Sequence, residues 1–381
     1  MTCLSTLSKG FMTWKNKQSL QKNLMTDLMN EKAYVGCLLG TAVGDSLGLP
    51  YEGISPRRAL RLFPDIERHH LLFGKGMVSD DTEHACLVAQ SLVRSNGELK
   101  AFERQLSRSL RWWLLGVPAG VGLATLKSIL KLWIGFPPNR SGTFSAGNGP
   151  AMRSPIIGVA MGGSVEDLRR FVMASTQVTH SDPRAFYGAL AVALAAYQSS
   201  IERSVSSARF LHELTSVLKE ESATEFIDLV KRAAESAAKG ESVSTFADAI
   251  GSTKGISGYI YHTVPCVLQV WFRFGSDFAG GLQEIISAGG DTDTTGAILG
   301  AIIGAQVGKE GIPESWLNAI IEWPRSIDWM ERLGIAVART LAGNGESSSC
   351  PGYFAPGIVI RNLVFLFLIL AHGLRRLAPP Y

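Results

Sequence analysis

The chain has 381 residues, of which 46% are hydrophobic and 18% are charged, and it contains 40 glycines and 16 prolines. This composition excludes collagen, coiled-coil arrays and mostly disordered polypeptides, and it predicts a buried core. The net charge is +4 and the basic residues are scattered, so the sequence carries no nucleic-acid footprint. No linker or charge block divides the chain, and a single large domain is therefore expected.

The N-terminal residues 1–30 carry lysines but no compact apolar stretch followed by small residues, which argues against a signal peptide. We interpret them as a loose extension, with Met25 and Met29 as alternative start positions. The main domain then covers 31–345, and a C-terminal tail covers 346–381.

Helical periodicity dominates the main domain. It is clear over 87–115, with a break near Asn96-Gly97, and again over 185–197 and 226–238. Strand-like alternation is scarce, so an α/β architecture is the less favoured alternative. We predict an all-α fold, a single compact orthogonal bundle of many helices. The segment 135–155 is a long loop rich in Ser, Asn and Gly, and loops of that size inside a domain are usually functional.

Glycine recurs at every fourth position in two predicted helices, over 36–48 and over 296–308. A glycine inside a helix costs about 1 kcal/mol relative to alanine, so each row needs a compensating gain. The simplest gain is a close backbone approach to a neighbouring helix. We therefore expect tight core packing along both rows.

Two acidic clusters lie just before predicted helices: Ser79-Asp80-Asp81-Thr82 and Gly289-Gly290-Asp291-Thr292-Asp293-Thr294-Thr295. Helix capping explains either cluster alone, because Asp, Ser and Thr are good N-caps. A cap uses one side chain, however, whereas four aspartates crowd here into apolar surroundings, where unpaired carboxylates repel one another and lose solvation. A bound cation resolves this conflict.

The chemistry of these ligands predicts the kind of cation. Carboxylate and hydroxyl oxygens without a nearby His or Cys suit a hard ion, Mg²⁺ first, with Mn²⁺ and Ca²⁺ as substitutes. Four carboxylates plus the Ser79 and Thr294 hydroxyls exceed what one Mg²⁺ usually takes from a protein. Two ions are therefore the better hypothesis.

With these motifs in place, the sequence resembles the ADP-ribosylglycohydrolases over most of its length. The resemblance rests on five motifs in family order: the 36–45 segment Gly-Cys-Leu-Leu-Gly-Thr-Ala-Val-Gly-Asp with Glu52 after it, the 79–82 cluster, Gly147-Asn148-Gly149-Pro150-Ala151-Met152-Arg153, Thr179-His180, and the 290–294 cluster. Each motif alone is weak, whereas five in order leave little room for chance.

The resemblance implies an all-helical fold with a two-magnesium centre at the mouth of a cleft, and hydrolysis of the bond between ADP-ribose and a protein side chain or small acceptor. By position, the implied metal ligands are Ser79, Asp80, Asp81, Asp291, Asp293 and Thr294. Glu52 matches a glutamate implicated in catalysis in some members, and we expect it, with Asp81 or Asp293, to exchange the proton of the reaction.

The expected substrate contacts are Gly147, Asn148, Gly149 and His180. The glycine loop offers backbone N–H groups free of Cβ obstruction, which suits a pyrophosphate or a ribose, although turn formation explains such a tripeptide equally well. A histidine at the start of a helix is often only a cap, but some family members place one near the substrate. Arg153 suits either a phosphate or a structural carboxylate.

Two other functions remain as alternatives. A catalytically silent ADP-ribose-binding or structural relative would be expected to have lost acidic ligands, but all are present. A phosphoryl-transfer enzyme or nucleotide hydrolase with two metals should show a phosphate loop, and none is visible. The linkage that is cut, whether to arginine, serine or an O-acetyl group, stays open.

The remaining expectations concern location and assembly. Five cysteines, odd in number and far apart, argue against a disulfide framework or structural zinc and favour a reducing cytoplasm. The apolar run 363–371 is shorter than the roughly 20 residues of a membrane span, so we expect a buried helix, with an interfacial anchor as the alternative and no membrane span. We also expect a monomer.

Overall fold

The computed structural model describes residues 14–342 and 349–375, and for residues 14–30 and Leu60 it describes the backbone alone. Within these ranges the chain is helical and contains isolated β-bridges but no strand. The predicted all-α fold is confirmed.

The helices follow one another with short connections. Their bounds are α1 Trp14–Gly48, α2 Pro56–Leu62, α3 Asp80–Ser95, α4 Leu99–Leu115, α5 Leu123–Trp133, α6 Pro138–Ser141, α7 Gly149–Met152, α8 Pro155–Met161, α9 Val165–Gln177, α10 Pro183–Ile201, α11 Ser207–Val217, α12 Thr224–Ala238, α13 Val243–Ala249, α14 Ile260–Phe274, α15 Phe278–Ser287, α16 Thr292–Val307, α17 Glu314–Ala319, α18 Ile327–Leu341 and α19 Gly357–Arg375, with 3₁₀ turns at Leu49–Tyr51, Glu221–Ala223 and Lys309–Gly311.

The predicted helices over 185–197 and 226–238 lie inside α10 and α12, and the break at Asn96-Gly97 separates α3 from α4. Asn96 adopts the left-handed conformation, with φ of 48°, and caps α3. The loop over 135–155 contains the short helices α6 and α7 and ends where α8 begins, at Pro155. The helices of the structure therefore lie where the periodicity of the sequence predicts them.

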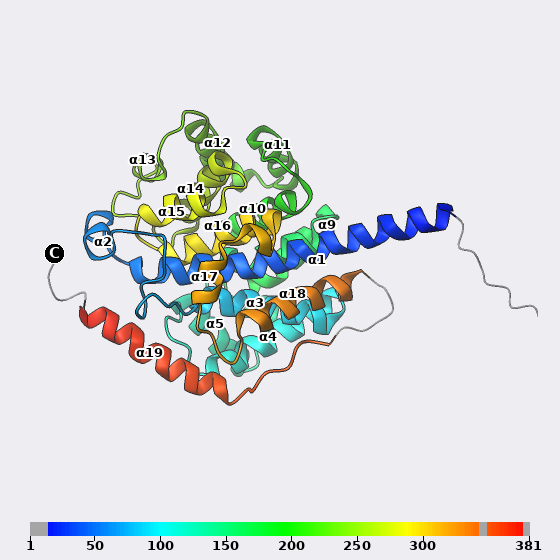
Figure 1. Ribbon diagram of the computed structural model, residues 1–381, viewed down its shortest axis with the longest axis horizontal. Coiled ribbons are helices and arrows are strands. Elements are labelled where there is room, and N and C mark those ends of the chain that lie inside the picture. The colour runs from blue at the N-terminus through cyan, green and yellow to red at the C-terminus, as the bar shows by residue number, and fades with distance from the viewer. Residues whose placement is uncertain (1–13, 343–348, 376–381) are drawn as a thin grey trace, which may run out of the picture.

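The two glycine rows pack against each other at the centre of the molecule (Figure 1), where α1 and α16 run antiparallel. A Cβ added at Gly40 would lie 2.0 Å from the backbone oxygen of Gly300, and one at Gly44 would lie 2.0 Å from that of Gly296. Only glycine permits this approach. The expected backbone contact is confirmed, and each row is the other's partner.

The N-terminal segment continues this central helix. α1 begins at Trp14 and runs unbroken to Gly48, and its first half projects beyond the other helices (Figure 1). Residues 14–30 are therefore helical where a loose extension was expected. Residues 1–13 lie outside the described part of the chain.

The C-terminal helix α19 lies along the outside of the body (Figure 1). The expectation of a buried helix is wrong, because only 28% of its apolar window is buried. The helix is also longer than the apolar run 363–371, and its 19 residues are long and apolar enough to cross a membrane by length and composition. It is the only such helix in the described residues.

Candidate metal and catalytic site

The two acidic helix entrances meet in space. Ser79 caps α3, its hydroxyl accepting a hydrogen bond from the Asp81 amide at 3.2 Å. From α16, the Thr294 hydroxyl donates to the Asp81 carboxylate at 3.2 Å, and the Ser79 hydroxyl donates to the same oxygen at 3.1 Å. One carboxylate thus joins the two clusters, which lie about 210 residues apart in the sequence.

The second entrance forms a carboxylate group with the segment that follows α1. Glu52, Asp291 and Asp293 each offer an oxygen, and these oxygens lie within 4.8 Å of one another. Asp293 is buried, whereas Glu52 is exposed and Asp291 is half-buried. Three carboxylates so close together repel unless a proton or a cation lies between them.

Burial sharpens this repulsion. Desolvation raises the pKa of Asp80, Asp81 and Asp293 well above the ordinary range. Neighbouring carboxylates raise them further, Asp45 being the largest contributor for Asp80 and Asp81. Glu52 is the largest such contributor for Asp293. In addition, Asp81 Oδ1 is buried without a hydrogen-bond partner among the described residues. This donor set of hard oxygens, with one oxygen orphaned, fits a divalent cation such as Mg²⁺.

Backbone hydrogen bonds between the Gly289–Asp291 segment and Ile256 fix the position of Asp291. Gly289 and Gly290 have φ of 67° and 88°, and a Cβ at Gly290 would lie 2.1 Å from the Ile256 oxygen. The Ile256 amide donates to Gly289, and the Asp291 amide donates to Ile256 at 2.7 Å. The glycine pair is therefore required for the loop to bring Asp291 into the site.

Asp45 is a site residue that the sequence analysis missed. Its carboxylate, fully buried in α1, accepts hydrogen bonds from the Ser79 amide at 2.9 Å, from the Thr82 amide at 3.1 Å and from the Thr82 hydroxyl at 2.5 Å. Burial raises its pKa to about 7, although these hydrogen bonds lower it. The signal was available, since Asp45 is the one charged side chain in the stretch 33–51.

Asn148 reaches the site in a different way from the one expected. Its side-chain amide donates to Asp291 Oδ2 at 2.6 Å and to the Thr263 hydroxyl at 3.1 Å. Its backbone amide donates to the Gly258 oxygen, and the Gly147 amide donates to the Ser145 hydroxyl. Asn148 therefore orients a predicted metal ligand, and these two N–H groups of the glycine loop already have acceptors.

His180 packs against the same loop. A Cβ at Gly147 would lie 3.3 Å from His180 Nε2, and one at Gly149 would lie 3.1 Å from Cε1, so the glycines leave room for the imidazole. Burial, and to a smaller extent the charge of Arg153, lower the pKa of His180 to about 3. His180 is therefore neutral. It also lines a cavity of about 560 Å³, but no residue of the glycine loop and no predicted metal ligand lines that cavity.

Arg153 is fully buried and takes neither of its expected partners. Its guanidinium donates to the Ser175 oxygen at 2.8 Å and to the Thr179 hydroxyl at 2.6 Å, and it lies 3.3 Å from His84 Nδ1. Desolvation lowers its pKa to about 9. Arg153 thus stabilises the Thr179-His180 segment through its hydrogen bond to the Thr179 hydroxyl.

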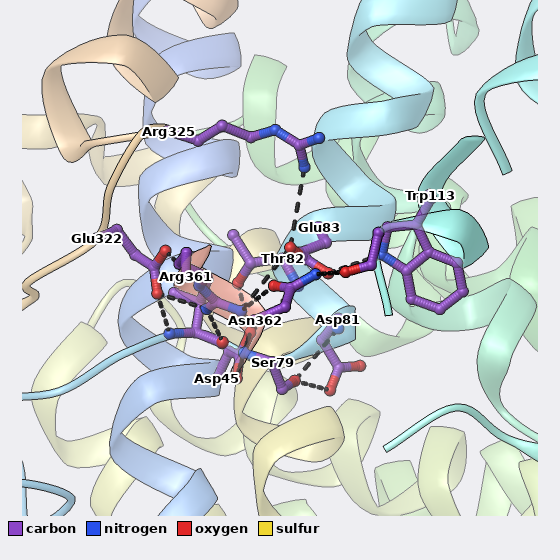
Figure 2. A network of polar contacts seen from close by, with 12 residues as sticks. Asp45, Ser79, Asp81, Thr82, Glu83, Trp113, Glu322, Arg325, Arg361 and Asn362 are labelled. Atoms are coloured by element: carbon purple, nitrogen blue, oxygen red, sulfur yellow. Dashed lines mark hydrogen bonds and ion pairs between the residues drawn. The ribbon is translucent and has the colours of Figure 1, made fainter. Parts of the chain in front are cut away.

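A buried polar network surrounds the α3 entrance and includes Asp45, Ser79 and Asp81 (Figure 2). The Arg361 guanidinium, from α19, donates to the Val78 oxygen and to Glu322, whose carboxylate accepts from the Val78 amide at 2.9 Å. In α3, Glu83 accepts from the Trp113 indole at 2.6 Å. Val78 immediately precedes Ser79. These contacts from α19 therefore hold in place the extended segment that leads into α3.

Comparisons with known proteins bear on this geometry. The family model described as ADP-ribosylglycohydrolase matches residues 26–347. Human ADP-ribosylhydrolase ARH3 is 30% identical over 323 residues, which cover 74% of this chain and 87% of that protein. The ADP-ribosyl-[dinitrogen reductase] glycohydrolase of Rhodospirillum rubrum is 27% identical over 292 residues, which cover 75% of this chain and 89% of that protein.

The fold has a counterpart among solved structures. A chain described as an ADP-ribosylglycohydrolase-related protein complex aligns with a TM-score of 0.61 and 24% identity, covering 82% of this chain and 99% of that chain. This similarity concerns the fold alone. The family match ends at residue 347, so α19 lies outside it.

Proposed function

The chain belongs to the ADP-ribosylglycohydrolase family and is an ADP-ribosyl glycohydrolase; from that premise we propose that it requires Mg²⁺ and releases ADP-ribose from a protein side chain or a small acceptor. The observation that carries this proposal is the carboxylate group of Glu52, Asp291 and Asp293, whose oxygens lie within 4.8 Å of one another. Its neighbour Asp81 is joined to α16 through Thr294.

The residues divide into two sets of oxygen ligands. Ser79, Asp80 and Asp81 come from the α3 entrance, and Asp291, Asp293 and Thr294 come from the α16 entrance. Because one Mg²⁺ takes few protein ligands, this number favours two ions. When bound, such ions supply Lewis-acid stabilisation and lower the pKa of a coordinated water.

Hydrolysis needs two proton movements. Water adds to the anomeric carbon of the ribose while the carbon–nitrogen or carbon–oxygen bond to the acceptor breaks, so the water loses a proton and the acceptor gains one. Glu52 is exposed at the edge of the carboxylate group and is the side chain best placed to exchange this proton with a substrate. Asp81 and Asp293 are buried and serve as its alternatives.

The glycine loop and His180 form the proposed substrate side of the site. Neutral His180 can either donate or accept one hydrogen bond at Nε2, which faces the loop. Asn148 holds Asp291 from the same loop. A ribose hydroxyl is the kind of group that fits between an imidazole and a metal-ligating carboxylate.

We also propose a reducing, cytoplasmic location and a monomeric state. The first is supported by the four described cysteines, Cys37, Cys86, Cys266 and Cys350, which are all free. Burial raises the pKa of the Cys86 thiol to about 12, so it stays protonated and unreactive. The monomeric state is tested by light scattering, in which a dimer would contradict it.

The activity test is incubation with arginine- and serine-linked ADP-ribosyl peptides and with O-acetyl-ADP-ribose, in Mg²⁺ or in EDTA, reading free ADP-ribose. We expect release from at least one substrate in Mg²⁺ and a loss of at least about 100-fold in EDTA. Full turnover in EDTA would refute the metal requirement. No release from any substrate would favour a catalytically silent binding protein.

The metal itself is tested by calorimetric titration with Mg²⁺ and Mn²⁺. Asp291→Ala is expected to weaken binding by at least about 10-fold, because loss of a residue that only orients a metal ligand already costs about 10- to 100-fold. The matched control is Asp228→Ala, which removes an exposed carboxylate of α12 paired with Lys231. Unchanged titration of Asp291→Ala would remove this residue from the ligand set. A parallel Glu52→Gln variant that turns over at the full rate with metal bound would exclude Glu52 from proton exchange.

A further inference from the structure

The polarity of α19 is inverted with respect to a helix on the surface of a water-soluble protein. Its outward face is lined by large apolar side chains: Ile360, Leu363, Val364, Phe367, Leu370 and Leu374. Phe367 is 71% exposed and Leu374 is 69% exposed. At 100° per residue these positions fall within an arc of about 120°, so they form one continuous stripe.

The polar side chains within the same helix point toward the protein, and only Arg375 at its end is exposed. Arg361 pairs with Glu322, and the Asn362 amide donates to the Gly116 oxygen at 2.8 Å. Farther along, His372 Nε2 lies 2.6 Å from the Leu71 oxygen, and the Arg375 guanidinium lies over the Phe63 ring at 5.8 Å. Water-soluble helices place their polar side chains outward, so this arrangement requires an apolar environment on the outer face.

Aromatic side chains extend the stripe at both ends. At the start of α19, the rings of Trp323 and Phe354 lie 6.1 Å apart, both are about half exposed, and a Cβ at Gly357 would touch each of them. Near the other end, Phe73 is fully exposed with φ of 46°, in the turn that follows Leu71. Tryptophan and phenylalanine at the edges of an apolar surface are typical of contact with the interfacial region of a bilayer.

We propose that α19 seats the protein on the surface of a lipid bilayer, with its outward stripe in the acyl-chain boundary. No side chain of the stripe can form a hydrogen bond, as hydrocarbon requires, whereas a protein interface normally includes polar contacts. The sequence after Glu346 contains no acidic residue but includes Arg361, Arg375 and Arg376, so its charged side chains are all positive, which favours an anionic lipid.

The helix lies on the membrane in this arrangement and does not cross it. Crossing would pull Arg361 away from Glu322, whose carboxylate is buried and would lose its ion pair. The inward side chains therefore fasten α19 to the body, and the outward stripe is left for lipid. At 1.5 Å per residue the helix presents a contact about 28 Å long.

The test is flotation of the full chain with phosphatidylcholine vesicles, with and without phosphatidylglycerol. We expect binding to both, tighter with the anionic lipid, and a loss of at least about tenfold in the double variant Phe367→Glu, Leu370→Glu. The matched control is the double variant Val165→Glu, Ile201→Glu, which adds the same two negative charges at half-exposed apolar side chains of α9 and α10. Circular dichroism checks that each variant folds.

Two outcomes would overturn the proposal. In one, the wild-type chain floats with neither vesicle; a wild-type dimer in light scattering that the double variant dissociates would then identify α19 as an interface between two copies. In the other, the double variant floats as well as the wild type does. The readout is independent of hydrolase activity, so it stands apart from the function proposed above.

Discussion

Two of the most apolar helices of this molecule have opposite surroundings. α16 is buried along almost its whole length, whereas α19 buries only Gly357, Arg361, Asn362 and Phe365. The difference lies in which residues interrupt the apolar sequence. Glycines at every fourth position let α16 press its backbone against α1. The polar residues of α19 instead fasten one side and leave the other apolar. Whether an apolar helix is buried therefore depends more on the position of its polar and small residues than on its overall hydrophobicity.

The largest expected effect on stability comes from disrupting the backbone contact between α1 and α16. In Gly40→Ala the new Cβ would meet the Gly300 oxygen at 2.0 Å, and both partners are backbone, so neither can move away cheaply. We expect a loss of more than about 4 kcal/mol in the free energy of unfolding, or failure to fold. Urea denaturation and soluble yield measure it. A variant within about 1 kcal/mol of the wild type would contradict the backbone contact.

The next effect separates the two faces of α19. Arg361→Leu removes the partner of the buried Glu322 carboxylate and the donor to the Val78 oxygen. We expect a loss of about 3 kcal/mol in unfolding free energy. Weaker Mg²⁺ binding should accompany it, because Val78 precedes the predicted ligand Ser79. Calorimetry with Mg²⁺ and urea denaturation measure both.

The control for this effect lies on the same helix. Leu363→Ala truncates a side chain of the outward face that is 53% exposed, and we expect a change within about 0.5 kcal/mol and unchanged Mg²⁺ affinity. Arg361→Lys keeps the charge without the planar fork and should fall between the two. Equal effects of Arg361→Leu and Leu363→Ala would show that the inward network does not support the site.

A third effect concerns the entrances of α3 and α16, where the ionisable groups are concentrated. Burial raises the pKa of Asp45 from 3.8 to about 7, so the metal-free folded state binds protons that the unfolded state has released. The protonated Asp45 carboxyl stabilises the folded state fully below pH 4, and this contribution is lost as pH rises to about 7. The free energy of unfolding falls by at most about 4 kcal/mol, since one pKa unit corresponds to about 1.4 kcal/mol. Mg²⁺ should oppose this loss, because its positive charge offsets the repulsion between the Asp45 carboxylate and the neighbouring Asp80 and Asp81.

Thermal unfolding across this pH range, with and without Mg²⁺, measures the effect. Asp45→Asn should flatten the slope of the metal-free protein, since an amide does not titrate. A metal-free protein whose stability rises between pH 4 and 7 would show that these carboxylates are ionised in the folded state, with hydrogen bonds such as that from Thr82 outweighing desolvation.

Much of the fold and part of the site could be predicted from the sequence, because the signals are local. The glycine spacing predicted backbone contact, and the hydroxyl and acidic residues before α3 and α16 predicted helix entrances. The meeting of the entrances is a long-range fact, since Asp81 and Thr294 lie in different helices. It followed from charge repulsion and from family resemblance, because no local pattern carries it.

The parts that could not be predicted depend on contacts between distant segments. The role of Asn148 depends on Asp291 being within reach, and that of Arg361 depends on Glu322. Burial of α19 was predicted from hydrophobicity alone, and the prediction was wrong. Its polar residues at 361, 362 and 372 share one face, and this periodicity was the available signal that the apolar face would point outward.

The smallest expected effect returns to glycine, now in α19. Gly373 has open space around it, with no atom within 4 Å of an added Cβ, in contrast to Gly40. Alanine there removes conformational freedom from the unfolded chain without a clash, so Gly373→Ala should raise the free energy of unfolding by about 0.5 kcal/mol. Urea denaturation resolves a change of this size when it is repeated. The same chemical change thus has opposite signs in the two helices, and a destabilised Gly373→Ala would mean that α19 packs against something on this side too.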